Sequence, residues 1–116
     1  GVAVLSRVVE QAAADLRHWD CDIVEIHHAG KVDAPSGTAL ALGAAAEGAG
    51  ATPRYASLRA GDVVGEHCVQ FTGAGERLEL VHRATNRDVF AHGALHAAGR
   101  LHGRAPGRYT LRDLLD

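Results

Sequence analysis

The first half of the chain has apolar residues at helical spacing, then an alternating segment, then a second helical segment. Through residues 2–16 the apolar positions recur at the spacing of one buried helical face, which predicts a helix. Residues 21–28, CDIVEIHH, alternate around a β-branched centre, which predicts a strand. An aperiodic segment, 29–35, separates this strand from a predicted helix that Ser36 can cap and that extends through Ala46.

The second half predicts three strands and a third helix. Strand-like runs cover residues 54–59, 63–72 and 76–82, and their short Gly-containing links favour antiparallel hairpins. A helix follows from Asn86 or Asp88 to about Leu101. Its predicted apolar face comprises Val89, Phe90, Ala94, Leu95, Ala97, Ala98 and Leu101. We therefore predict an α/β (α+β) fold in one domain, residues 1–116, with a mixed, largely antiparallel sheet of about four strands and helices packed on one face.

Composition and charge narrow the class of protein. The 116 residues are 47% hydrophobic and 22% charged, which is typical of a globular domain. Cys21 and Cys68 are too few for a secreted disulfide framework, and no stretch has the apolar length of a membrane span or signal peptide. We expect a soluble, cytoplasmic protein with no membrane partner. A net charge of -2 and 4% aromatic residues argue against a nucleic-acid partner.

Candidate chemistry is concentrated between residues 25 and 40. His27, His28 and Lys31 stand where the predicted strand gives way to a loop, and Ser-Gly-Thr at 36–38 begins the next helix. Lys31 is the only lysine beside eleven arginines, and an ammonium, unlike a guanidinium, can give up a proton. The free N–H groups of a helix start attract carboxylate or phosphate, and Gly37 lets a ligand approach the backbone. The segment predicts an anionic-substrate site with proton donors beside it.

Other interpretations of these residues stay open at this point. Histidines at strand ends are often surface residues; if the strand continues, His27 and His28 point to opposite faces. A metal site is the weaker hypothesis because this pair brings no cysteine or acidic ligand at zinc spacing. His92 and His96 lie one helical turn apart, but the pattern lacks the glutamate of His-Glu-x-x-His. We therefore predict no metal site.

Long segments of the chain resemble one enzyme family. The pattern Glu-x-His-His-x-x-Lys-x-Asp-x-Pro-Ser-Gly-Thr-Ala, found here in EIHHAGKVDAPSGTALALG, strongly resembles the signature of the 4-hydroxy-tetrahydrodipicolinate reductases, also called dihydrodipicolinate reductases, of diaminopimelate and lysine biosynthesis. Further matches are GVAVLSRVVEQAA, RAGDVVGEH, GERLELVHRATNR and FAHGALHAAGRL. The resemblance therefore covers nearly the whole chain.

The resemblance implies a C-terminal domain that binds substrate and forms a homotetramer through its sheet. Family members use NADPH or NADH to reduce a cyclic dicarboxylate imine. By resemblance, His27 is the catalytic proton donor and acceptor and Lys31 is a second catalytic proton donor. His28 contacts the substrate, and Gly37 with Thr38 binds its carboxylate. With the helix-start argument, the substrate-binding set is then His28, Ser36, Gly37 and Thr38.

The chain also departs from the family pattern. No Gly-x-Gly-x-x-Gly follows a predicted strand, and the glycines at 73 and 75 are predicted to form a turn. The cofactor-binding residues are therefore expected on an N-terminal domain that is absent here, and this fragment alone is expected to be inactive. Ala29 and Gly30 stand where many members carry basic residues. The alternative is a non-catalytic oligomerisation or small-anion-binding module on the same scaffold.

Overall fold

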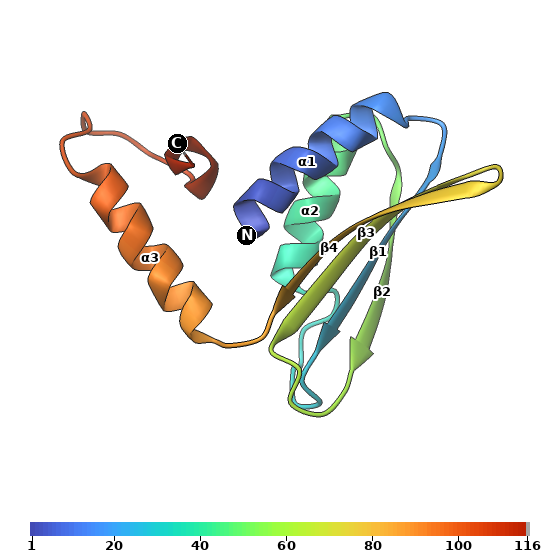
Figure 1. Cartoon of the computed structure of the whole chain (residues 1–116), viewed down its shortest axis with the longest axis horizontal. Coiled ribbons are helices and arrows are strands. Elements are labelled where there is room, and N and C mark those ends of the chain that lie inside the picture. Colours follow the sequence, from blue (N-terminus) through green and yellow to red (C-terminus); the bar gives the residue numbers. More distant parts are fainter. Residues whose placement is uncertain (116) are drawn as a thin grey trace.

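A computed structural model describes residues 1–115 as a four-stranded sheet with three α-helices and one short 3-10 helix (Figure 1). The elements in chain order are α1 (Val2–Asp15), β1 (Asp20–His27), α2 (Gly37–Gly48), β2 (Pro53–Arg59), β3 (Gly65–Gly73), β4 (Glu76–Ala84), α3 (Asp88–Leu101) and the 3-10 helix η1 (Leu111–Leu114). Within the described chain, no helix is long and apolar enough to cross a membrane. The predicted fold class is confirmed.

The strands lie in the order β2-β1-β3-β4, so that β1 lies between β2 and β3. Strand β1 pairs in parallel with β2 and antiparallel with β3, and β3 pairs antiparallel with β4. The predicted hairpin between β2 and β3 is therefore wrong, whereas the hairpin between β3 and β4 is observed. The physical reason is that β2 returns through α2 to one edge of β1, so that β3 must use the other edge.

The link between β2 and β3 consequently passes over the end of β1. Its Ala60 N–H donates to the His27 carbonyl at 2.9 Å, and the Ala29 N–H donates to the Gly61 carbonyl at 3.0 Å. These two bonds fix the backbone on both sides of His28. The link that was predicted as a simple turn thus forms one wall of the region where the candidate chemistry is concentrated.

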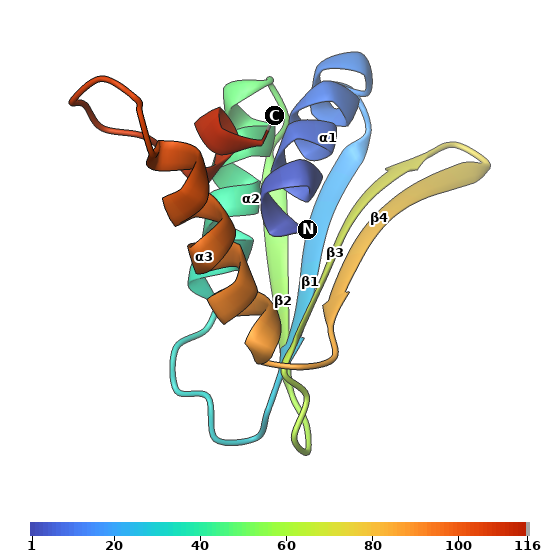
Figure 2. The same ribbon diagram turned by 60° about the vertical axis from the view of Figure 1, so that its left-hand side comes forward.

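The core lies between the sheet and helices α1 and α2, which both cover one face (Figure 2). Its members come from the apolar side of each element: Leu5, Val9, Ala13, Cys21, Ile23, Ala39, Leu42, Ala46, Ala51, Val69 and Phe71. No helix of residues 1–115 covers the opposite face, which we call the open face. Its apolar side chains are exposed or half-buried and comprise Val24, Ile26, Ala56, Leu58, Cys68 and Val81.

Helix α3 differs from the expectation that helices pack on the sheet. It stands apart from the sheet, contacts η1 and buries none of its residues (Figure 1). On its predicted apolar face, Phe90 is 57% exposed and Leu95 is 72% exposed. The amphipathic pattern identified the helix correctly, but the pattern does not specify which surface such a face packs against.

Candidate functional site

The candidate site forms at the end of β1, where the strand breaks between the two histidines. Alternation along β1 places Cys21, Ile23 and Glu25 on the side that faces the helices, and His27 continues that side as the last strand residue. His28 is exposed and opens a turn, in which the Lys31 N–H donates to the His28 carbonyl at 3.1 Å. The break releases His28 from the strand's alternation and brings Lys31 back toward the sheet.

The Glu25 carboxylate is the centre of this region and is fully buried. Its Oε2 lies 2.5 Å from His27 Nδ1, and its Oε1 accepts the Ser36 N–H at 3.1 Å. Arg59 reaches over from β2 and donates to both oxygens, each at 2.9 Å. Burial alone would raise the pKa of Glu25, but these hydrogen bonds outweigh it and lower the pKa to about 2. Glu25 is therefore ionised throughout the neutral range.

Arg59 also connects Glu25 to the loop that carries Lys31. Its Nη2 donates to the Asp33 carbonyl at 2.7 Å, and its Nη1 donates to the Leu58 carbonyl at 2.7 Å. The Asp33 carboxylate accepts from Lys31 Nζ at 2.8 Å, and this bond lowers the pKa of Asp33. The Lys31 side chain is 21% exposed, so its ammonium lies at the surface of the site rather than in the core.

Helix α2 begins beside Glu25 and presents free N–H groups. Ser36 caps it, because its Oγ accepts the Ala39 N–H at 3.1 Å. Within residues 1–115, the N–H groups of Gly37 and Thr38 have no hydrogen-bond partner. No atom other than those of neighbouring residues comes within 4 Å of where a Gly37 Cβ would stand. The helix therefore begins with two unpaired donors and with open space beside Gly37, which is an arrangement suited to a carboxylate.

His67, on β3, is a buried member of the site that the sequence analysis did not single out. Its Nε2 lies 2.9 Å from Ser36 Oγ, and its ring stands edge-on to the His27 ring with centroids 5.1 Å apart. Burial, followed by the charge of His27, lowers the pKa of His67 to about 4. His67 is thus neutral at physiological pH and can share a single hydrogen with the Ser36 hydroxyl.

The structure brings most of the predicted site residues together, while Ser36 and His28 differ from the rest in how they are placed. Glu25, Arg59 and their bonded loop bring together His27, Lys31 and the start of α2 at residues 36–38. Ser36 is only 2% exposed as a whole residue. Its hydroxyl points inward, where it contacts His67 Nε2 and accepts the Ala39 N–H. His28 is exposed and makes no side-chain hydrogen bond within the described chain.

Sequence reasoning missed Glu25, Arg59 and His67, although two of them carried a signal. Glu25 occupies the apolar side of an alternating strand, and His67 alternates in the same way with Val69 and Phe71. A polar side chain on a buried strand face requires a partner, so its presence there points to a network. Arg59 carried no such signal because its partner is 34 residues away in the sequence.

Neither a metal nor a nucleotide finds a matching arrangement of residues in the described chain. Residues 1–115 contain no group of three or more His, Cys, Asp or Glu side chains that could hold a metal, and His92 and His96 lie exposed on α3. The glycines at 73 and 75 belong to the hairpin that joins β3 to β4. They are not followed by a helix, which a pyrophosphate site of the Gly-x-Gly-x-x-Gly type requires.

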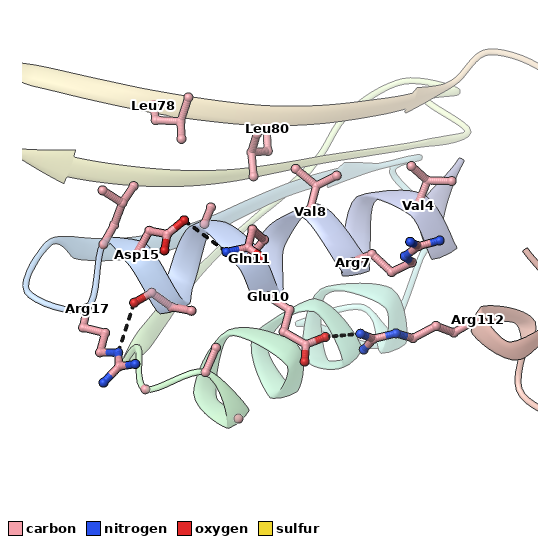
Figure 3. Close-up of a pocket in the computed structure, with 16 residues that line it drawn as sticks. Val4, Arg7, Val8, Glu10, Gln11, Asp15, Arg17, Leu78, Leu80 and Arg112 are labelled. Carbon is pink, nitrogen blue, oxygen red and sulfur yellow. Dashed lines mark hydrogen bonds and ion pairs between the residues drawn. The ribbon is translucent and has the colours of Figure 1, made fainter.

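A cleft lies apart from this site. It has a volume of about 1320 Å³ and runs along α1 toward β4, between Val4, Val8 and Leu78 (Figure 3). Its polar rim includes the ion pair of Arg112 with Glu10 and the hydrogen bond from Gln11 to Asp15. None of the predicted site residues lines it.

Comparison with known proteins assigns the chain to a family. Residues 1–115 match the family described as dihydrodipicolinate reductase, C-terminus. The chain belongs to this family. The predicted dihydrodipicolinate reductase resemblance is therefore confirmed, and it covers all described residues.

Three similar bacterial proteins are all named 4-hydroxy-tetrahydrodipicolinate reductase. The chain is 73% identical over 115 residues to the 4-hydroxy-tetrahydrodipicolinate reductase of Stenotrophomonas maltophilia (strain K279a), covering 99% of this chain and 48% of that protein. It is 70% identical to that of Xanthomonas campestris pv. campestris (strain B100) and 65% identical to that of Xylella fastidiosa (strain 9a5c), with the same two coverages. The chain thus spans about half the length of the dihydrodipicolinate reductases that it matches.

A solved structure has the same fold. It is a dipicolinate-bound dihydrodipicolinate reductase from Paenisporosarcina sp. TG-14, and the superposition has a TM-score of 0.73 with 23% sequence identity. The match covers 87% of this chain and 46% of that chain. At this level of identity the likeness supports the fold of the dihydrodipicolinate reductase C-terminal domain and nothing finer.

Proposed function

We propose that this chain is the substrate-binding domain of an NAD(P)H-dependent 4-hydroxy-tetrahydrodipicolinate reductase, an enzyme of diaminopimelate and lysine biosynthesis. One observation carries the proposal: His27, Lys31 and the unpaired N–H groups of α2 lie around Glu25, whose carboxylate is the only fully buried one in residues 1–115. Relatives with up to 73% identity carry this enzyme's name, and a protein of the same fold is described as dipicolinate-bound. Both facts support a cyclic dicarboxylate as the ligand.

The start of α2 is the proposed binding site for one substrate carboxylate. The Gly37 and Thr38 N–H groups are unpaired within the described chain, and the positive end of the helix dipole favours an anion there. The Thr38 hydroxyl supplies a further donor, and His28, exposed on the adjoining turn, contacts the ligand from the other side. Ser36 serves this site through its cap, because its hydroxyl holds the first turn of the helix in place.

His27 and Lys31 are the proposed proton donors. Reduction of an imine consumes a hydride and a proton, and a positioned side chain is an efficient source of that proton. His27 Nδ1 is hydrogen-bonded to the Glu25 carboxylate, so Nε2 is the nitrogen that remains to exchange a proton with a ligand. The Lys31 ammonium lies at the surface of the same region and donates to the Asp33 carboxylate. A substrate carboxylate can compete with Asp33 for this ammonium.

The hydride would come from NADPH or NADH bound elsewhere in the whole enzyme. Residues 1–115 contain two Gly-x-Gly sequences, and neither follows a strand and opens a helix as a dinucleotide site requires: residues 48–50 lie at the end of α2 before β2, and residues 73–75 lie in the hairpin from β3 to β4. We therefore assign cofactor contacts to no residue of this chain. Its residues supply the substrate cradle and the proton, which are the parts of the reaction that this chain's chemistry fits.

The open face of the sheet is the proposed surface for assembly into a homotetramer. It carries exposed apolar side chains, among them Leu58 at 49% and Val81 at 41% exposure. Burying such a surface between copies removes apolar area from water. The mass of the purified chain by light scattering tests this arrangement, with a monomer at high concentration as the contradicting result.

Binding of pyridine-2,6-dicarboxylate tests the proposed substrate site. Calorimetric titration of this chain is expected to show binding that Lys31→Ala weakens at least tenfold, since one ionic contact is lost. The control is Arg77→Ala on β4, an exposed cation on the open face, which is expected to leave affinity unchanged. Equal affinity in all three proteins, or no binding in folded protein, would contradict the site.

Turnover by the full-length enzyme tests the proposed proton donors. His27→Ala and Lys31→Ala are each expected to lower kcat by about 10²- to 10⁴-fold, the usual loss for a general acid. Circular dichroism of both variants should match the unsubstituted enzyme. Unchanged kcat in both folded variants would remove them from the mechanism.

A further inference from the structure

We propose that Glu25 and Arg59 are positioning residues, which fix the His27 ring and the start of α2 relative to each other so that proton donor and carboxylate cradle act on one substrate. This inference rests on the proposed function. It concerns residues that act through other groups: Glu25 is fully buried, and the terminal N–H groups of Arg59 all donate to protein oxygens.

The two oxygens of Glu25 serve different parts of the site. Oε2 takes the His27 Nδ1 contact at 2.5 Å, and Oε1 accepts the Ser36 N–H at 3.1 Å. The carboxylate therefore spans the distance between the last residue of β1 and the cap of α2. A displacement of this one group would change the orientation of the histidine and the position of the helix start together.

Arg59 holds the carboxylate in that position from the neighbouring strand. Its Nη1 and Nη2 each donate to a different Glu25 oxygen at 2.9 Å, in the forked geometry that arginine provides and lysine does not. The same two nitrogens donate to the carbonyls of Leu58 and Asp33. All four terminal N–H bonds of the guanidinium are thus used, which fixes its plane and hence the plane of Glu25.

The arrangement also fixes which nitrogen of His27 carries the proton in the neutral ring. Glu25 accepts three hydrogen bonds from Arg59 and Ser36 and is ionised, so it has no hydrogen to donate and Nδ1 must hold the shared one. Nε2 is left on the far side, next to Gly65, where a Cβ would come within 3.2 Å of it. The absence of a side chain at Gly65 leaves room for Nε2.

Glu25→Gln is the variant that tests the inference, since it keeps the shape and removes the charge. The amide oxygen is expected to take the place of Oε1, where the Ser36 N–H and Arg59 Nη2 both donate. The amide NH₂ then takes the place of Oε2, where it faces His27 Nδ1 and no longer accepts from Arg59 Nη1. An NH₂ donates, so the neutral ring must accept at Nδ1 and carry its hydrogen on Nε2. The tautomer of His27 is therefore expected to reverse.

Nitrogen-15 NMR of His27 in this chain at alkaline pH reads that tautomer directly. The unsubstituted chain is expected to show a protonated Nδ1 and a bare Nε2, and Glu25→Gln the opposite pattern. In the full-length enzyme the same variant is expected to lower kcat by about 10²-fold or more and to raise KM, since an orienting carboxylate beside a catalytic histidine can be worth up to about 10⁴. A merely structural residue would not reverse the tautomer.

Asp22→Asn is the matched control. Asp22 lies on the same strand as Glu25 and accepts a forked pair of bonds from Arg54 of β2 at 2.7 and 3.0 Å, but on the opposite face. It is expected to leave the tautomer of His27 unchanged and kcat within about twofold, with the assembly state checked by light scattering. A loss of kcat in this control equal to that in Glu25→Gln would overturn the assignment.

The outcomes separate this inference from the proposed function. If His27→Ala lowers kcat while Glu25→Gln changes neither kcat nor the tautomer, the positioning role is wrong and the proton donor stands. If His27→Ala has no effect, the proposed proton donor itself is wrong. Should Glu25→Gln not fold, Arg59→Lys decides: a lysine cannot bridge both oxygens, so kcat must fall at least tenfold with the tautomer retained, and an unchanged kcat refutes the role.

Discussion

Two acid–arginine pairs join the same two strands on opposite faces of the sheet. Asp22 and Arg54 meet on the open face with side chains that are 26% and 63% exposed, whereas Glu25 and Arg59 meet under the helices with 0% and 19% exposed. Both pairs are forked. The exposed pair has one further neighbour, Asp20, whose carboxylate lies 3.8 Å from Arg54 Nη2. The buried pair is hydrogen-bonded to His27, Ser36 and Asp33.

The comparison shows that burial, and not the ion pair itself, gives the pair its role. An exposed pair competes with water and salt, so its members add little to stability and impose little order. A buried carboxylate must satisfy every lone pair inside the protein, which forces neighbouring groups into fixed positions around it. In this chain those neighbours are the proposed proton donor and the helix start.

The largest expected effect is on folding. Removing one member of a buried pair leaves an unpaired charge, so Glu25→Ala should lower the free energy of unfolding by about 3–5 kcal/mol. Asp22→Ala should cost several-fold less, because Arg54 is free to turn to water. Urea unfolding of this chain, at a concentration where light scattering shows a monomer and the open face is therefore in water, measures both losses, and equal losses would show that the faces do not differ.

A double replacement is expected to separate stability from function. Glu25→Leu with Arg59→Met removes both charges, which often restores most of the stability lost by breaking such a pair. Activity of the full-length enzyme should not recover, since nothing then holds His27 Nδ1 or the Ser36 N–H. A stable double variant with normal kcat would mean that the buried pair serves folding alone.

Acid unfolding is expected in two stages. His67 has its pKa lowered from 6.5 to about 4, so between these values only the unfolded chain takes up that proton and stability falls as pH falls. Glu25, lowered from 4.5 to about 2, adds a second loss from pH 4.5 down to pH 2. Above pH 6.5 the stability contributed by His67 and by Glu25 is fully present.

The first stage is checked by measuring the thermal unfolding midpoint of the unsubstituted chain and of His67→Gln from pH 8 to pH 2.5. This variant should flatten the fall between pH 6.5 and pH 4, apart from a smaller contribution of the same sign from His82, whose pKa is also lowered by burial. An unchanged slope would show that His67 does not control it.

The smallest expected effect is the response to salt. Raising ionic strength to 1 M should weaken the exposed pair and leave the buried one intact, since screening acts through water. At 1 M salt, Asp22→Ala and the unsubstituted chain should have the same free energy of unfolding. Glu25→Ala should still have a lower free energy of unfolding than the unsubstituted chain. Urea unfolding at low and high salt measures this, and a shared salt response would place both pairs in water.

Much of the fold could be predicted from local pattern. The strand β1, the helix α2 and its Ser36 cap all follow from alternation, helix propensity and capping chemistry, which act over a few residues. The position of β2 could not be predicted, because a short link to β3 gives the same local signal whether the strands are neighbours or flank a third. The packing of α3 was missed because an apolar face does not specify its partner.

The candidate site divides in the same way. His27, Lys31 and the start of α2 lie within twelve residues, so their density in the sequence marks them. Glu25 also lies there, but its role depends on Arg59 from another strand, and the role of Ser36 depends on His67 from a third. Such partners are set by strand order, which the sequence pattern did not give.

The central claim is that the start of α2 and His27 together bind a cyclic dicarboxylate. The most direct test is amide and imidazole NMR of this chain during addition of pyridine-2,6-dicarboxylate. We predict saturable shifts at the Gly37 and Thr38 amides and at His27 Nε2, with the exposed amides of α3 unmoved. Shifts confined to other regions, or none at these three groups under saturating ligand, would contradict the claim.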